Sequence, residues 1–167
     1  TVDAYLDALT VNARAQRRDR FFTYLTSVAE ERAYYESGAT AGIGVRLAFD
    51  GSNRLFVTEA FEGGPALAAG VDRGAQIVAI GSSTTTLRPI SDILSTGTAE
   101  LDRVLDTSTP GTTRVLRITD ASGTREVTVS STNYAVSPVS TRYGSKVIDD
   151  NGRKVGYVNL RTFIDTA

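Results

Sequence analysis

The sequence predicts an α+β chain: a helical segment over residues 1–37, a mixed unit of strands and short helices over 38–135, and further strands in 136–167. Three observations predict it. Apolar residues recur at helical spacing before residue 37. Alternation of apolar and small or polar residues begins at Ile43, as in a half-buried strand. An Asn151-Gly152 pair, a strong hairpin signal, then divides the last apolar stretch.

The composition excludes several classes of function. The chain has 167 residues, 41% hydrophobic and 22% charged, which is typical of a globular protein. It has no apolar run near the ~20 residues of a membrane helix, and no start resembling a signal peptide. A net charge of -1 gives no reason to expect a nucleic-acid partner. Cysteine and histidine are absent, which excludes disulfides and Ser-His-Asp catalysis and leaves zinc only carboxylate ligands. We expect no metal and no cofactor.

The first 37 residues show two apolar stripes at helical spacing, and they predict helix from residue 2 to about 36. The stripes are Leu6, Leu9 and Ala13, then Phe21, Phe22, Leu25, Val28 and Ala29. Between them lies a basic cluster, Arg14, Arg17, Arg18 and Arg20, which we interpret as a solvated helix face because the net charge is near zero.

The mixed unit is predicted element by element. Strands are expected at 43–49, 55–60, 76–80, 113–119 and 125–131, and helices at 65–69 and 98–107. Residues 81–97 are rich in Ser, Thr and Gly and predict a long surface loop, in which Ile90, Ile93 and Leu94 could anchor a helical turn. A last hairpin is predicted from 146–148 and 155–163. Its alternating residues suggest one buried face whose partner is not visible in the sequence, so we interpret the last strand as incomplete.

The glycines of Gly42-Ile43-Gly44-Val45 could form an anion site. With no Cβ at two positions, a ligand can approach the backbone, and several N–H groups can hold one carboxylate. A peptide could continue from there as an added strand along 43–49. Its side chains would meet the groove residues Leu47, Leu101, Val104 and Leu105, the last three of which form a helical stripe.

Two other interpretations of this loop were weighed. The glycines could simply ease a tight entry into a strand. A dinucleotide-binding loop needs a third glycine where this chain has Leu47, which argues against that class.

The loop and the segments after it resemble the PDZ domains of bacterial proteins. Gly42-Ile43-Gly44-Val45 resembles their carboxylate-binding loop, and residues 63–80 resemble their G-S-P-A-x-x-A-G-hydrophobe-x-x-G-D-x-I-x-x-I segment. Gly64 stands where serine is usual, and Ala75-Gln76 where glycine-aspartate is usual. The basic residue that often precedes the loop is missing, with Arg32 the nearest candidate. The resemblance implies a partly open β-barrel with two helices over 38–135 that binds polypeptide C-termini.

The flanks resemble carboxyl-terminal processing (tail-specific) peptidases. Residues 20–38 look like their helical lead-in, and residues 146–163 like the first strands of their catalytic domain. The resemblance implies an exported protein, of the bacterial periplasm or cell envelope, in which a Ser/Lys dyad cleaves substrates whose tails the PDZ domain captures. It also implies that 136–167 begin a catalytic domain whose remainder lies outside this chain.

We expect no catalytic residue within the chain itself. Its only lysines are Lys146 and Lys154, and Ser145 adjoins Lys146, so the two side chains would point to opposite faces of a strand. Two alternatives stay open: a non-catalytic interaction or inhibitory PDZ module whose groove is filled from within, and an enzyme active by itself, which should cleave peptides.

Overall fold

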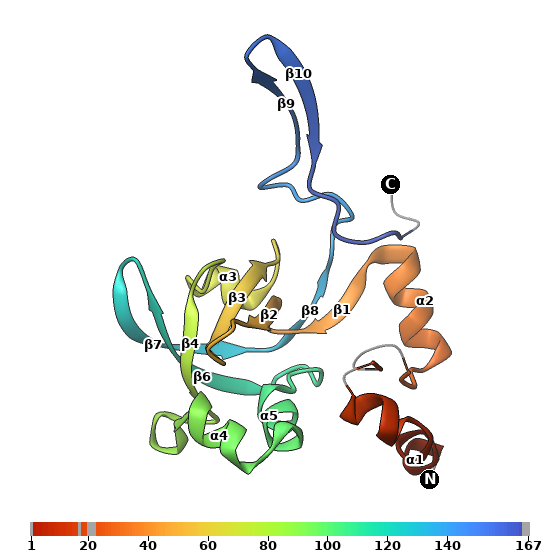
Figure 1. Cartoon of the computed structure of the whole chain (residues 1–167), viewed down its shortest axis with the longest axis vertical. Helices are drawn as coiled ribbons and strands as arrows, with labels where there is room; N and C mark the ends of the chain where they lie inside the picture. Colours follow the sequence, from red (N-terminus) through yellow and green to blue (C-terminus); the bar gives the residue numbers. More distant parts are fainter. Residues whose placement is uncertain (1, 17, 20–22, 165–167) are drawn as a thin grey trace. The chain divides into compact units, whose positions relative to one another are not determined.

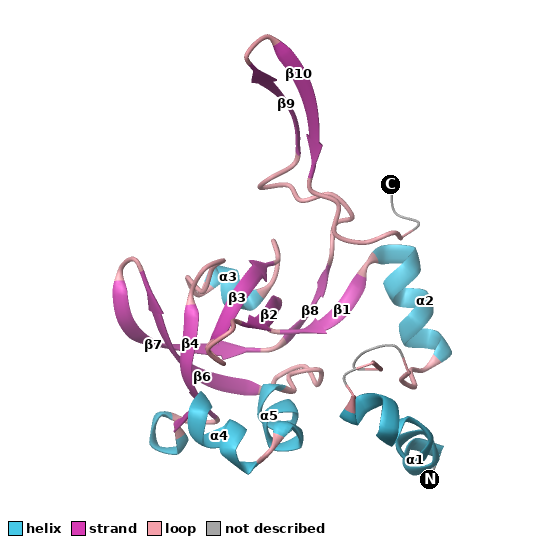
Figure 2. Ribbon diagram, in the orientation of Figure 1, coloured by secondary structure: helices cyan, strands magenta, loops and turns pink. Residues whose placement is uncertain are grey.

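The computed structural model describes residues 2–16, 18–19 and 23–164. Helices and antiparallel sheets occur together, so the α+β prediction is confirmed (Figure 2). The chain divides into two compact units, residues 1–32 and 33–167, and each is described by itself.

The N-terminal region forms two helices, α1 (Val2–Ala15) and α2 (Val28–Ser37). The prediction of helix from residue 2 to about 36 is therefore wrong for described residues 23–27, which are not helical. The Ser27 hydroxyl accepts a hydrogen bond from the Glu30 N–H at 3.1 Å, and the Ser27 N–H donates to the Glu30 carboxylate at 3.2 Å. This reciprocal capping box starts a new helix at Val28.

The apolar stripe predicted on α1 is not a buried face within this unit. Leu9 is 61% exposed, whereas Thr10 is buried and its hydroxyl donates to the Leu6 carbonyl at 2.8 Å. Of the basic cluster, Arg14 pairs with Asp7 at 2.6 Å. The predicted positions Arg17, Arg20, Phe21 and Phe22 lie outside the described residues.

The second unit is built on an antiparallel sheet in the order β2-β3-β4-β6-β7, with a short β5 beside β4 (Figure 1). Its strands are β2 (Val45–Phe49), β3 (Leu55–Ala60), β4 (Gln76–Gly81), β5 (Arg88–Pro89), β6 (Thr113–Asp120) and β7 (Gly123–Ser130). All five long strands match the predicted ranges within two residues at each end. The predicted 43–49 strand begins later, because Ile43 and Gly44 form a bend before β2.

Short helices connect these strands: α3 (Pro65–Ala68), a 3-10 turn η1 (Thr84–Thr86), α4 (Ile90–Thr96) and α5 (Thr98–Leu105). The prediction of a long surface loop over 81–97 is thus wrong, and the helical turn considered for Ile90, Ile93 and Leu94 is the helix α4. Ile90 and Ile93 of α4 are 4% and 0% exposed, so burial of two isoleucines outweighs the polar composition of the segment.

A single hydrophobic core lies between the sheet and the helices. Its largest fully buried side chains are Leu55, Ile77, Ile80, Ile93, Leu116 and Ile118. Burying each such side chain stabilises the fold by roughly 1.5–3 kcal/mol. The core therefore fixes β4 and β6 under α4 and α5.

Two further two-stranded sheets lie outside this main sheet. β1 (Ala39–Gly42) pairs antiparallel with β8 (Thr132–Ala135), a pairing that the sequence analysis missed. Among the described residues the three sheets remain separate, so no closed barrel forms.

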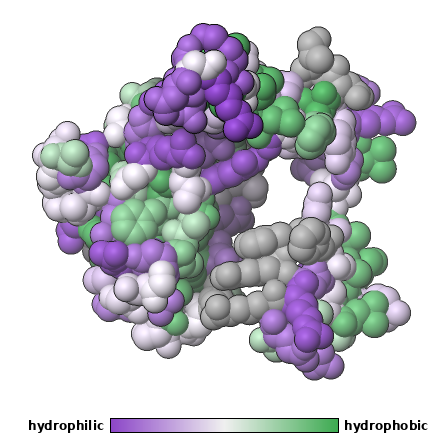
Figure 3. All heavy atoms as spheres, turned by 45° about the horizontal axis from the view of Figure 1, so that its top comes forward, coloured by the Kyte–Doolittle hydropathy of each residue, from purple (hydrophilic) through white to green (hydrophobic). Residues whose placement is uncertain are grey.

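The last hairpin consists of β9 (Ser145–Asp150) and β10 (Arg153–Val158). Asn151 and Gly152 have φ of 52° and 85°, the left-handed backbone that a tight hairpin turn needs. Every residue of both strands is exposed, so the predicted buried face is not buried in this structure, and β10 ends at Val158 instead of Phe163. Polar residues gather where the hairpin tip comes forward (Figure 3).

The chain on both sides of the hairpin is fastened to the main sheet by the Arg161 cluster, which we define as Glu59, Glu62, Ser140 and Arg161. The Arg161 side chain is 2% exposed and contacts both carboxylates, with its Nε 2.5 Å from Glu59 Oε1. Its Nη2 also donates to the Ser140 hydroxyl at 3.1 Å. Residues 140 and 161 are thereby held against β3 and the turn that follows it.

Candidate functional site

The Gly42–Val45 loop joins β1 to β2, and its shape depends on glycine. Gly44 has φ of +79°, and a Cβ added there would lie 2.6 Å from the Cα of Gly64. A Cβ added to Gly64 would lie 2.9 Å from the Cα of Gly44. The two glycines therefore pack backbone against backbone, and a side chain at either position would collide with the other glycine.

Two N–H groups of this loop are left without an acceptor. The carbonyl of Ile43 accepts from the Ala66 N–H at 2.8 Å, and that of Gly44 accepts from the Phe61 N–H at 2.9 Å. The N–H groups of Ile43 and Gly44 make no hydrogen bond to any described residue. The loop is thus fixed through its carbonyls while its donors stay available.

The outer edge of β2 is also open. β2 pairs with β3 on one side and with no other described strand. Val57 lies opposite Leu47, but its N–H and C=O bond to Ala75 and Gly74 on the far side of β3. By the alternation of an antiparallel ladder, the N–H and C=O of Leu47 then face the open edge, where another strand can pair.

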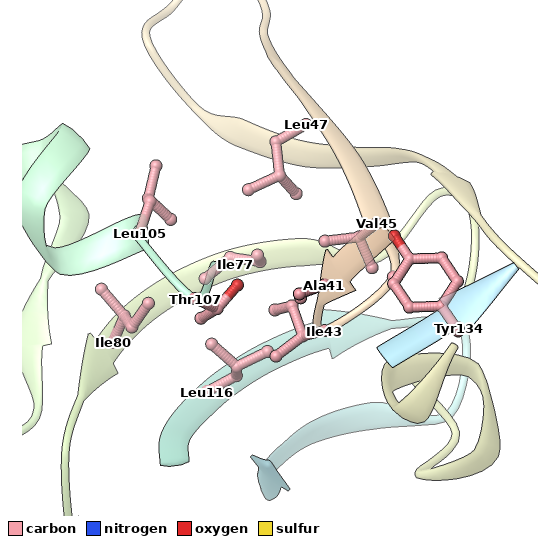
Figure 4. A pocket seen from close by; sticks show the side chains of 12 residues that line it. Ala41, Ile43, Val45, Leu47, Ile77, Ile80, Leu105, Thr107, Leu116 and Tyr134 are labelled. Atoms are coloured by element: carbon pink, nitrogen blue, oxygen red, sulfur yellow. The ribbon is translucent and has the colours of Figure 1, made fainter. Parts of the chain in front are cut away.

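A pocket of about 150 Å³ lies between the loop, β2 and the end of α5 (Figure 4). Leu47 and Val45 project from β2 on one side, and Leu105 faces them from α5. Ile77, Ile80 and Leu116 of the core form its floor. The pocket therefore combines an apolar floor with free backbone donors at one end.

Most of the predicted site residues meet at this pocket. Gly42, Ile43, Gly44, Val45, Leu47 and Leu105 line it. Leu101 does not, because it lies one turn earlier in α5 and is buried in the core, with 3% exposure. Val104 is partly buried against the same core and does not line the pocket either.

The sequence analysis missed the remaining lining residues, Ala41, Ile77, Ile80, Thr107, Leu116 and Tyr134. Ile77 and Ile80 belong to a strand predicted to be buried, so a groove helix over that strand could have indicated them. Thr107 and Tyr134 come from segments far apart in sequence, and no local pattern marks them.

Among the described residues, no charged side chain lines the pocket. The nearby Arg46 guanidinium is engaged elsewhere, with Glu59 at 3.4 Å and the Arg161 carbonyl at 3.1 Å. Burial raises the pKa of the Tyr134 phenol, and the positive charge of Arg46 offsets this only in part. Arg32, the nearest basic residue ahead of the loop in sequence, belongs to the first compact unit.

The two lysines are not paired with a serine. Lys146 lies opposite Tyr157 in the hairpin, with its Nζ 6.0 Å from the ring centre, and Ser145 lies opposite Val158. Lys154 pairs with Asp149 at 2.5 Å. Within the described ranges there is no cluster of three metal-ligating side chains, and no helix is long and apolar enough to cross a membrane.

No protein-family model and no curated protein matches the chain. Among solved structures, it is similar to the PDZ domain of a carboxy-terminal protease from Vibrio cholerae in complex with a peptide, with 16% identity and a TM-score of 0.46. It is also similar to a photosystem II D1 C-terminal processing protease, with 21% identity and a TM-score of 0.46. A third match is an S41 protease from Bacteroides fragilis, with 17% identity and a TM-score of 0.42.

These matches cover different shares of each protein. The PDZ domain is covered over 99% of its length by 59% of this chain. The chain spans 33% of the processing protease and 46% of the S41 protease, using 76% and 84% of its own length. All three are of the kinds that the sequence motifs resemble.

Proposed function

We propose that the pocket between β2 and α5 binds the C-terminal end of a polypeptide. The observation that carries the proposal is the pair of unbonded N–H groups of Ile43 and Gly44, at the end of an open strand edge. A carboxylate is the ligand that such converging backbone donors suit. The peptide behind it adds to β2 as an antiparallel strand.

The pocket also suggests which termini bind. The last side chain enters a space of about 150 Å³ whose floor is apolar, so small and medium aliphatic termini fit. Backbone pairing along β2 is insensitive to sequence. Selectivity therefore lies in the terminal side chain and the carboxylate.

In the intact protein, we propose that this capture serves a carboxyl-terminal processing peptidase of the Ser/Lys class, exported as the motif resemblance implies. Residues 136–167 would then lead into its catalytic domain. The chain itself should not cleave, because neither lysine is placed at a serine hydroxyl.

The rival function is a module whose groove is filled from within. In the described part of the chain no segment occupies the pocket, which favours an external ligand.

Calorimetric titration with a peptide ending in Ala-Val tests the proposal. We expect saturable binding that weakens by at least tenfold when the C-terminus is amidated, because the amide removes the charge that the free N–H groups hold. Equal binding of acid and amide, or none, would contradict it. Mass spectrometry of the same mixture should show the peptide intact.

A further inference from the structure

Two side-chain hydroxyls flank the carboxylate loop. Thr107 lies at the Gly42 end: a Cβ added to that glycine would lie 3.6 Å from Thr107 Oγ1. Tyr134 lies at the other end, because its ring stacks on Phe61 at 6.2 Å, and the Phe61 N–H bonds to the Gly44 carbonyl. Both side chains line the pocket, and Figure 4 shows the Tyr134 oxygen beside Val45.

Neither hydroxyl is used by the fold. Over the described part of the chain, Thr107 Oγ1 and the Tyr134 phenol have no hydrogen-bond partner. Some hydroxyls of this unit are engaged, as Tyr34 is with Thr162 at 2.8 Å, but among the described residues only those of Thr107 and Tyr134 lie in the pocket lining. Two free donors beside two free N–H groups indicate a ligand rich in acceptors.

We propose that Thr107 and Tyr134 donate hydrogen bonds to the terminal carboxylate of the bound peptide, in place of a basic side chain. This rests on the proposed function of the pocket. None of the described residues that line the pocket is charged, so the donors that the lining offers a carboxylate are neutral. The two N–H groups of the loop and the two hydroxyls make four donors, which match the acceptor sites of one carboxylate.

The state of the phenol is compatible with this role. Burial raises the pKa of Tyr134, so the phenol keeps its proton through neutral pH and donates throughout that range. Phenylalanine at this position would keep the ring stacked on Phe61 and remove only the donor.

The test uses Tyr134→Phe and Thr107→Val, each titrated with a peptide ending in Ala-Val and with its amidated form. We expect each variant to bind the free acid roughly tenfold more weakly, since a hydrogen bond to a charged group is lost. The amide should bind all variants as it binds the unchanged chain. Matched controls are Tyr143→Phe, whose ring lies beside Arg73 and Arg142, and Thr128→Val on an exposed position of β7. Neither control should change binding.

The outcomes separate the two proposals. If the unchanged chain prefers the acid and both variants keep that preference in full, the backbone alone holds the carboxylate and the hydroxyl assignment is overturned. If a variant binds the acid and the amide forms of the peptide equally more weakly, its hydroxyl contacts the terminal side chain of the peptide or supports the fold. That result also overturns the assignment. If the unchanged chain shows no preference for the acid, the proposed function fails and the assignment fails with it.

Discussion

The groove is lined by residues of β2, and the Arg161 cluster contains Glu59 of β3, the strand paired with β2. The two regions differ in how their polar groups are bonded. In the cluster, one buried guanidinium contacts two carboxylates and a hydroxyl, so the charges are paired within the chain. In the groove, the N–H groups of Ile43 and Gly44 have no partner among the described residues. Polar groups that are paired within the chain stabilise the fold, whereas unbonded donors held in fixed positions can bind a ligand.

The two regions are also physically joined. The Phe61 ring lies under the guanidinium of Arg161 at 5.4 Å and stacks on Tyr134, which lines the pocket. Its N–H holds the Gly44 carbonyl at 2.9 Å. Substitutions in either region can therefore test how the two regions differ.

Removing Arg161 should have the largest effect on stability. Arg161→Ala removes the buried guanidinium from Glu62 and leaves Glu59 only the exposed Arg46 at 3.4 Å, and loss of one partner of a buried ion pair costs about 3–5 kcal/mol. Urea unfolding measures the loss. Arg103→Ala is the matched control, because Arg103 is 70% exposed and pairs with Glu100 at the surface, where we expect a change of at most ~1 kcal/mol. Equal losses of unfolding free energy in the two variants would show that the Arg161 cluster does not stabilise the fold more than a surface ion pair does.

Gly44→Ala should damage the groove. Its Cβ would lie 2.6 Å from the Gly64 Cα, in a backbone conformation of φ +79°. We expect a loss of about 1–3 kcal/mol in stability and loss of peptide binding, since the loop must shift. Gly51→Ala is the control: its added Cβ would meet nothing within 4 Å. A Gly44→Ala chain that binds peptide normally would mean that the loop conformation is irrelevant to the site.

Leu105→Ala should weaken peptide binding and lower the stability of the fold less than Leu101→Ala does, because Leu105 is only partly buried against the core. Leu105 lines the pocket, whereas Leu101 of the same helix lies in the core. Loss of buried methyl groups should cost roughly 1–2 kcal/mol of peptide affinity, measured by calorimetry. Leu101→Ala should instead cost about 2–5 kcal/mol of stability. The reverse pattern would show that our division between pocket and core residues is wrong.

The smallest expected effect is a change in the free energy of unfolding that occurs only at acidic pH. Burial alone would raise the pKa of Glu62, but hydrogen bonds from Arg161, Arg142 and Ser140 lower it to about 2. A depressed pKa stabilises the fold above the unfolded value near 4.5 and loses that stabilisation as pH falls toward 2. The free energy of unfolding should therefore be flat above about pH 5 and fall below it, and Glu62→Gln should flatten the fall. An unchanged acid slope in that variant would remove Glu62 from this role.

The sequence predicted the groove better than the helices around it. The loop glycines, β2 and Leu105 were found because glycine spacing and strand alternation are local patterns. Leu101 and Val104 were misplaced because a stripe at helical spacing does not show which of its members meets the core and which the pocket. Thr107 and Tyr134 were missed because only the pairing of β1 with β8 and the end of α5 bring them to the loop.

The Arg161 cluster could not be predicted either. Arg161 bonds to Ser140, 21 residues earlier in the sequence, and to Glu59, 102 residues earlier. The break between α1 and α2, by contrast, had a local signal in the Ser27–Glu30 capping box. Features set by neighbouring residues could therefore be predicted from the sequence, whereas contacts between residues distant in sequence could not.

Capture of a carboxylate by the loop can be observed at the backbone amides of the loop itself. A peptide ending in Ala-Val is titrated into the isotope-labelled chain, and NMR follows each N–H. The free acid should shift the Ile43 and Gly44 amides strongly as hydrogen bonds form, and the amidated peptide should shift them far less. Shifts confined to other parts of the chain, or equal shifts with both peptides, would contradict capture of a carboxylate at this loop.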